Sequence, residues 1–192
     1  MEYRSSISQE QIDQLELAHF KGEIVLIDKL DESYFQSIEE IKYNKVLGFD
    51  TETKPSFVAG EKRNGVALLQ LSTSNKAYLF RLNHIALPKE LSAILSNKRI
   101  LKVGAAVHDD IKGLQRYNKF TPNGFIDLQN FVDKYGIAEK SVRKMAAIIL
   151  GVKISKSQQL SNWEGPSLTE AQLQYASIDA WACLEMYKRI KD

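Results

Sequence analysis

The sequence predicts an α/β fold in which helices flank a mixed β-sheet. Segments rich in β-branched and aromatic residues come first, segments with helical spacing predominate afterwards, and one strand–helix–strand crossover is indicated. The chain has 192 residues, of which 44% are hydrophobic and 26% are charged. This length and composition suit one globular domain with a well-developed core, which we expect over residues 23–192.

The first part of the chain is predicted to form an arm and then most of the sheet. Residues 1–22 are polar with a few apolar positions, so we expect an arm or short helix packed on the domain. Residues 23–28 predict a short strand, and a helix follows to Lys42 with Asp31 or Ser33 as its N-cap. Turn residues then separate three strands of an antiparallel meander. These strands are Val46–Thr53, Val66–Thr73 and Ala77–Leu82.

Helices dominate the rest of the chain. The last helix is marked by Ser167 and Glu170, which fit a capping box directly after Pro166. Its core-facing stripe comprises Leu173, Ala176, Ala180, Leu184 and Tyr187. The preceding elements are a helix over Pro88–Ser96, a strand over Ile100–Ala105, a helix from about Asp109 to Tyr117, and a helix over Val142–Leu150 closed by Gly151.

Charge and cysteine content restrict the possible partners and compartments. The net charge is only +2, so affinity for nucleic acid requires local basic patches. One such cluster comprises Lys140, Arg143, Lys144, Lys153 and Lys156, although a solvated helix face explains the same charges equally well. Cys183 is the single cysteine, the start is too polar for a signal peptide, and Met145–Leu150 is too short to span a bilayer. We therefore expect a soluble intracellular protein without a membrane partner.

Carboxylates interrupt three otherwise apolar stretches. Asp50 and Glu52, in "VLGFDTET", are two apart on a predicted strand, so their side chains leave the same face. The pair also fits the exposed end of a strand, but its apolar lead-in favours the C-terminal end of a central strand. Asp110 lies near a helix start, where the helix dipole alone favours an acid. Asp109 competes with it, but Asp110 is closer to the apolar face of that helix.

The third stretch places Tyr175 and Asp179 four residues apart on the last helix, so both side chains lie on one face. A core aromatic explains Tyr175 taken singly. An ionised carboxylate in an apolar setting is costly unless it is paired or binds a metal. A shared divalent cation with oxygen ligands is the simplest common explanation for the three acidic stretches.

Together these stretches resemble the three motifs of the DEDD superfamily of 3′–5′ exonucleases, in the variant with tyrosine in the third motif. The first is "FDTE", the second "VGAAVHDDIKGL", and the third "LSNWEGPSLTEAQLQYASIDAWACLEMY". The likeness is greatest to ribonuclease D and the exonuclease domain of the Werner syndrome helicase, and covers about residues 45–190. It implies a ribonuclease-H-like α/β fold with a mixed five- or six-stranded sheet and helices on both faces. It also implies removal of nucleoside 5′-monophosphates from the 3′ ends of DNA or RNA.

The resemblance assigns metal binding to Asp50, Glu52, Asp110 and Asp179, and positioning of the attacking water to Tyr175. All-oxygen ligation selects Mg²⁺ or Mn²⁺, and two such ions about 3.5–4 Å apart can activate water and stabilise the leaving oxygen. We expect Asp50 to bridge both ions, Glu52 and Asp179 to complete the first site, and Asp110 to hold the second ion through waters. His108 departs from the usual pattern and leaves Asp109 as the alternative ligand.

Four further residues are candidates for substrate binding. Lys156 and Trp163 lie in the stretch before the last helix, and Lys112 and Arg116 lie one turn apart on the helix of Asp110. Trp163 could stack on a base, but packing in the core explains it better. A catalytically silent nucleic-acid-binding module is the alternative function, and no obligatory protein partner is evident from the sequence. The sequence does not choose between DNA and RNA.

Overall fold

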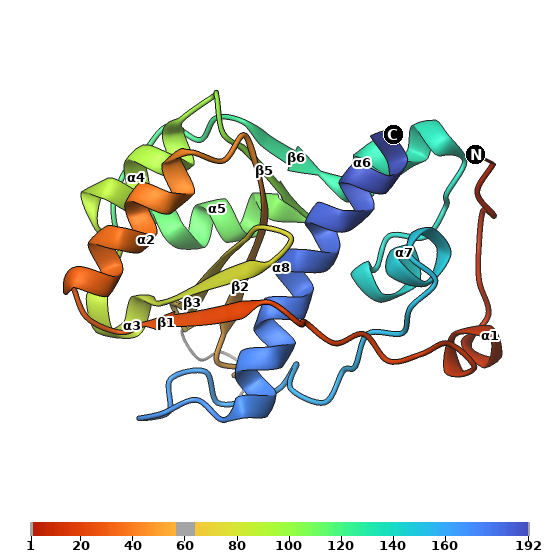
Figure 1. The fold of residues 1–192 in the computed structure, drawn as a ribbon, viewed down its shortest axis with the longest axis horizontal. Coiled ribbons are helices and arrows are strands. Elements are labelled where there is room, and N and C mark those ends of the chain that lie inside the picture. Colours follow the sequence, from red (N-terminus) through yellow and green to blue (C-terminus); the bar gives the residue numbers. More distant parts are fainter. Residues whose placement is uncertain (1, 57–63, 192) are drawn as a thin grey trace.

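The sheet has six strands in the order β1-β4-β3-β2-β5-β6, in a computed structural model that describes residues 2–56 and 64–191 (Figure 1). Strands β2, β3 and β4 form the predicted antiparallel meander, whereas β1 runs parallel to β4, and β5 runs parallel to both β2 and β6. The predicted mixed sheet is therefore confirmed. The strands are β1 (Glu23–Ile27), β2 (Val46–Thr53), β3 (Val66–Ser72), β4 (Lys76–Arg81), β5 (Leu101–Gly104) and β6 (Phe125–Asp127).

Helices cover both faces of the sheet, as predicted. On one face, Ile38, Leu91 and Leu114 pack in one core cluster with Phe49 and other strand residues. On the other face, residues of α6, α7 and α8 form a second cluster. The helices are α1 (Gln9–Asp13), α2 (Glu32–Lys42), α3 (Leu82–Ile85), α4 (Lys89–Ser96), α5 (Val107–Gln115), α6 (Leu128–Phe131), α7 (Val142–Ile149) and α8 (Glu170–Lys191), with a 3-10 turn over Val132–Tyr135.

Helix ends follow local capping chemistry. The Asp31 carboxylate accepts from the Tyr34 backbone N–H at 3.3 Å, which decides between the two predicted caps of α2. Gly151 ends α7 as predicted, with φ +70 and its N–H donating to the Ala146 carbonyl at 3.1 Å. Helix α5 begins at Val107, two residues before the predicted start.

The capping box of α8 lies two residues later than predicted. The Thr169 hydroxyl accepts from the Gln172 N–H at 3.2 Å, and the Gln172 Oε1 accepts from the Thr169 N–H at 2.9 Å. The assignment of the box to Ser167 and Glu170 is wrong. The buried Arg81 guanidinium donates to the Pro166 carbonyl at 2.9 Å and to the Gly165 carbonyl, so it holds this segment outside the helix.

One buried lysine fixes the end of α4. Lys102 is 0% exposed, and its Nζ donates to the carbonyls of Ile94, Asn97 and Ile100 at 3.2, 2.9 and 2.7 Å. Burial lowers the pKa of Lys102 to about 8. The ammonium group therefore adds a charged donor to three carbonyls at and just after the C-terminal end of α4, two of which also accept backbone hydrogen bonds.

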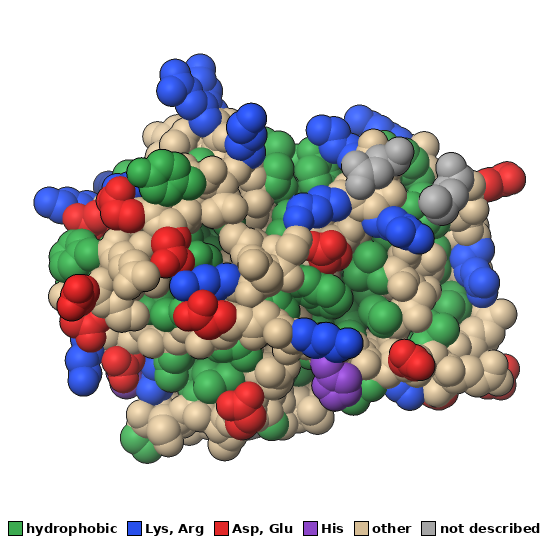
Figure 2. Space-filling model, in the orientation of Figure 1, with side chains coloured by type: hydrophobic (Ala, Val, Ile, Leu, Met, Phe, Trp, Pro, Cys, Tyr) green, Lys and Arg blue, Asp and Glu red, His purple; other side chains and the backbone are tan. Residues whose placement is uncertain are grey.

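The N-terminal arm packs against α7, and the chain ends with α8. Helix α1 follows a capping box made by Ser8 and Gln11, and Ile7 and Ile12 are buried against Ala147 of α7. Figure 2 shows Lys and Arg side chains gathered where α8 ends, and three basic residues lie in that last turn. Cations there complement the helix dipole.

In the described part of the chain, none of the helices combines the length and apolar character needed to cross a membrane.

Candidate active site

Strand β2 presents its carboxylates toward α8. Leu47 and Phe49 lie in the core cluster on the opposite face, so Asp50 and Glu52 point to the α8 side by strand alternation. Gly48 allows the close approach of α8, since an added Cβ would lie 1.9 Å from the Ala180 carbonyl oxygen. A side chain at position 48 would thus move α8 away from the two acids.

Helix α8 brings Asp179 and Tyr175 to this pair. Carboxylate oxygens of Asp50, Glu52 and Asp179 all lie within 4.8 Å of one another. The Tyr175 hydroxyl donates a hydrogen bond to the Asp179 carboxylate, one helical turn away. Two segments more than 120 residues apart therefore form one cluster, with Glu52 9% and Asp179 8% exposed.

The cluster is electrostatically unfavourable without a cation. Burial and the Asp179 and Asp110 charges raise the pKa of Asp50 well above its ordinary value. Burial and the charges of Asp50, Asp179 and Asp110 raise the pKa of Glu52 to about 10, and burial raises the pKa of Asp179 to about 7. Burial also raises the pKa of the Tyr175 phenol. A divalent cation would reverse these shifts because it favours the ionised carboxylates.

Asp110 approaches from the other face of the sheet. Its Oδ1 accepts a hydrogen bond of 2.5 Å from the Thr51 hydroxyl, and Thr51 lies between the two acids of β2. Burial raises the pKa of Asp110 to about 6. Asp109 points outward with a side chain 83% exposed, so the geometry favours Asp110 as the inward acid of the second motif. Asp110 is nevertheless outside the group of three mutually close carboxylates.

Two hollows lie beside these acids. One, of about 330 Å³, contains the three clustered carboxylates and Tyr175 together with Arg143, Lys156 and Gln159. The other, of about 420 Å³, contains Asp110 with Lys54, Asn64 and Arg116. The strand carrying Thr51 separates them, and both are large enough to admit part of a nucleotide chain.

The four predicted substrate-binding residues differ in position and exposure. Lys156 is exposed in the wall of the carboxylate pocket, and Arg116 lines the Asp110 pocket. Lys112 lies 3.8 Å from the Asp109 carboxylate, with 59% of its side chain exposed. Trp163 is 0% exposed and packs against Tyr175 with ring centroids 6.1 Å apart. Of the two roles open to Trp163, this burial supports packing, because its ring forms part of the core beside Tyr175.

Sequence reasoning did not select two residues that the structure places at the site. Gln70 of β3 lies directly opposite Asp50, is 0% exposed, and has no hydrogen-bond partner for either amide atom within the described residues. A lone amide in the apolar run "VALLQLS" was the available signal. Arg143 was noted only as one charge in a basic cluster, because its place in the pocket depends on packing.

The donor set fits a hard divalent cation. It consists of carboxylate oxygens without cysteine or histidine, which is the ligand chemistry of Mg²⁺ and Mn²⁺ in proteins. Asp50, Glu52 and Asp179 would hold one ion, and Asp110 lies near enough to raise the pKa of Asp50 electrostatically. The raised pKa values have the direction expected of carboxylates that a cation would neutralise.

Comparison with known proteins gives consistent matches. A family model described as 3′–5′ exonuclease matches residues 24–192. The bifunctional 3′–5′ exonuclease/ATP-dependent helicase WRN of Mus musculus is 32% identical over 187 residues, which cover 93% of this chain and 13% of that protein. Exonuclease 3′–5′ domain-containing protein 2 of Drosophila melanogaster is 33% identical over 150 residues, covering 76% of this chain and 25% of that protein. The chain thus spans a quarter or less of these relatives.

Solved structures show the same fold. The Nibbler EXO domain of Aedes aegypti has a TM-score of 0.76 and 25% identity, with 91% of each chain covered. Escherichia coli RNase D has a TM-score of 0.77 and 23% identity, covering 88% of this chain and 44% of that one. The fold and the resemblance to ribonuclease D and the Werner-type exonuclease are confirmed. The chain belongs to the 3′–5′ exonuclease family, whose members are hydrolases acting on nucleic acids.

Proposed function

We propose that this chain is an active, metal-dependent 3′–5′ exonuclease that hydrolyses the terminal phosphodiester bond of DNA or RNA and releases nucleoside 5′-monophosphates. The observation that carries the proposal is the cluster of Asp50, Glu52 and Asp179 oxygens within 4.8 Å of one another. A family member that had lost catalysis would not need to retain three clustered, largely buried carboxylates at this energetic cost. Nucleic-acid 3′ ends are the proposed partners.

Mg²⁺ or Mn²⁺ is the proposed cofactor, with two ions per site. Asp50 would contact both ions, Glu52 and Asp179 would complete the first site, and Asp110 would hold the second. When bound, two such ions supply an activated water and charge stabilisation for the leaving oxygen. Thr51 fixes the Asp110 carboxylate through the 2.5 Å hydrogen bond, which restricts its rotation.

Tyr175 is proposed to orient the attacking water. Its hydroxyl is already directed at Asp179, and burial raises the phenol pKa, so the group remains protonated at neutral pH. A protonated phenol donates or accepts a hydrogen bond but does not remove a proton from water. Lys156, exposed in the same pocket and without an ion pair among the described residues, supplies a positive charge for a backbone phosphate.

The test is hydrolysis of matched 3′-labelled DNA and RNA oligonucleotides with Mg²⁺, Mn²⁺ or EDTA. We expect release of labelled mononucleotide with either metal, no release in EDTA, and no nicking of a circular substrate. Asp50→Ala is expected to remove the activity while its far-UV circular dichroism stays unchanged. Binding without cleavage under every metal condition would instead identify a catalytically silent binding module, and nicking of the circle would identify an endonuclease.

A further inference from the structure

Arg143 of α7 lies in the wall of the pocket that contains the three clustered carboxylates. Its side chain is only 20% exposed. It makes no ion pair with Asp50, Glu52 or Asp179, and it is not among the causes of their pKa shifts. A cation beside an acidic pocket, but unpaired with its acids, is available to an anion that enters the pocket.

The guanidinium is oriented by α1. Arg143 Nη1 donates to Gln9 Oε1 at 3.0 Å, and Nη2 lies 3.5 Å from Asp13 Oδ1. The Nε atom is buried and has no hydrogen-bond partner among the described residues. A guanidinium carries five N–H donors, and the contacts with Gln9 and Asp13 leave one N–H on each Nη atom unused besides the buried Nε–H. A guanidinium held in a pocket wall with unused Nη donors suits a charge-assisted contact with a phosphate.

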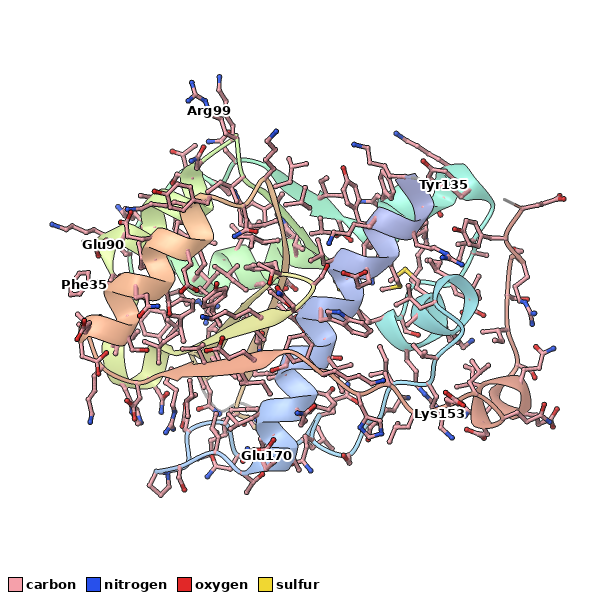
Figure 3. The ribbon with its side chains drawn as sticks, in the orientation of Figure 1. Phe35, Glu90, Arg99, Tyr135, Lys153 and Glu170 are labelled. Atoms are coloured by element: carbon pink, nitrogen blue, oxygen red, sulfur yellow. The ribbon has the colours of Figure 1, made fainter. Side chains whose placement is uncertain are left out.

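The same arm is joined to the segment that carries Lys156. The Lys153 Nζ donates to the Asp13 carbonyl at 3.0 Å. The backbone carbonyl of Lys153 accepts from the Ala18 N–H at 2.8 Å. Lys153, labelled in Figure 3, lies between α1 and the chain that leads to α8. Residues 1–23 lie outside the residues that the family model matches.

We propose that Arg143 and Lys156 form a subsite for a non-bridging phosphate of the nucleic-acid backbone, next to the phosphate that is hydrolysed. Asp13 and Gln9 are its positioning residues, because they hold Nη2 and Nη1 of the Arg143 guanidinium in the wall of the pocket. This subsite rests on the proposed exonuclease function, since it supposes that a nucleic-acid strand occupies the pocket.

Binding is measured in an Asp50→Asn background, so that the readout does not depend on turnover. The probe is a short 5′-fluorescein-labelled single strand, followed by fluorescence anisotropy across a series of salt concentrations. Arg143→Ala is expected to raise Kd by about 10-fold or more, the loss that follows removal of a charge-assisted contact. It should also reduce the slope of log Kd against log salt by about 0.7, the value for one phosphate of a single strand.

Asp13→Asn tests the positioning role. We expect Kd to rise by about 3- to 10-fold, and the Asp13→Asn/Arg143→Ala double variant to bind like Arg143→Ala alone, since both changes act on one group. Glu10→Gln, which removes an acid from the same helix, is the matched control and should leave Kd unchanged. The melting temperature of Asp13→Asn should stay within about 2 °C, because exposed ion pairs contribute little stability.

Three outcomes would overturn the inference. An unchanged Kd and salt slope in Arg143→Ala would show that no phosphate contacts this residue. An unchanged Kd in Asp13→Asn, or additive effects in the double variant, would remove the positioning role. Tighter binding by Asp13→Asn would show that the aspartate competes with the ligand. Failure of hydrolysis with intact, Arg143-dependent binding would instead count against the proposed catalysis alone.

Discussion

Replacing Asp179 by asparagine is expected to stabilise the metal-free protein while removing its response to divalent cations. Burial raises the pKa of Asp179 to about 7 in the folded protein, against an ordinary value of 3.8. Between pH 3.8 and about 7 the folded state therefore retains a proton that the unfolded state has released. The free energy of unfolding falls as pH rises through this range, and the whole of this destabilisation is present above pH 7. Asparagine cannot ionise and avoids this loss.

The size of the gain follows from the shift. A difference of three units at 1.36 kcal/mol per unit sets an upper limit of about 4 kcal/mol. Water entering from the adjoining pocket lowers the desolvation penalty, so we expect about 1–3 kcal/mol above pH 7. For a chain of this length that corresponds to a rise of about 3–10 °C in the melting temperature. At pH 5 the gain should be less than half as large, because the folded-state carboxyl is already protonated there.

Thermal unfolding in EDTA at pH 5 and pH 8, followed by circular dichroism, measures this directly. Added Mg²⁺ or Mn²⁺ should raise the melting temperature of the unaltered protein but have little effect on Asp179→Asn, since only the native site binds the ion. Asp109→Asn, which removes an exposed carboxylate nearby, is the control and should show no gain at either pH. A lower melting temperature for Asp179→Asn at pH 8 in EDTA, or equal gains at both pH values, would refute the reasoning.

Three further substitutions test contacts that hold the site and the fold. Gly48→Ala places a methyl group against the Ala180 carbonyl. It should lower the free energy of unfolding, measured in urea, by about 3 kcal/mol and reduce turnover. Unchanged stability would contradict the close contact. Thr51→Val removes the hydrogen bond that lowers the pKa of Asp110. It should reduce kcat/KM by about 10-fold, and Thr51→Ser should restore most of it. Lys102→Met removes three hydrogen bonds from the buried ammonium group to the carbonyls of Ile94, Asn97 and Ile100, and the melting temperature should fall by about 4–10 °C.

Local patterns in the sequence were sufficient for much of the fold and for the composition of the site. Strand β2 and its two acids follow from alternation, and the stacking of Tyr175 on Asp179 follows from helical spacing. The closure of α7 by Gly151 also depends on neighbours only a few residues away. Two overlapping capping-box patterns compete at the start of α8. Thr169 caps the helix instead of Ser167, because Arg81 of β4 holds the carbonyls of Gly165 and Pro166.

Only the tertiary structure decided which side chains meet across the sheet and which are buried. Thr51, opposite in direction to its two acidic neighbours, directs Asp110 to the far side of β2. Trp163 is removed from solvent by packing against Tyr175, and Gln9 reaches Arg143 across 134 positions of sequence. Propensity and periodicity act over a few residues, whereas burial and contacts between elements are set by residues distant in the chain. The sequence therefore determined which groups could perform the chemistry, and packing determined where each of them acts.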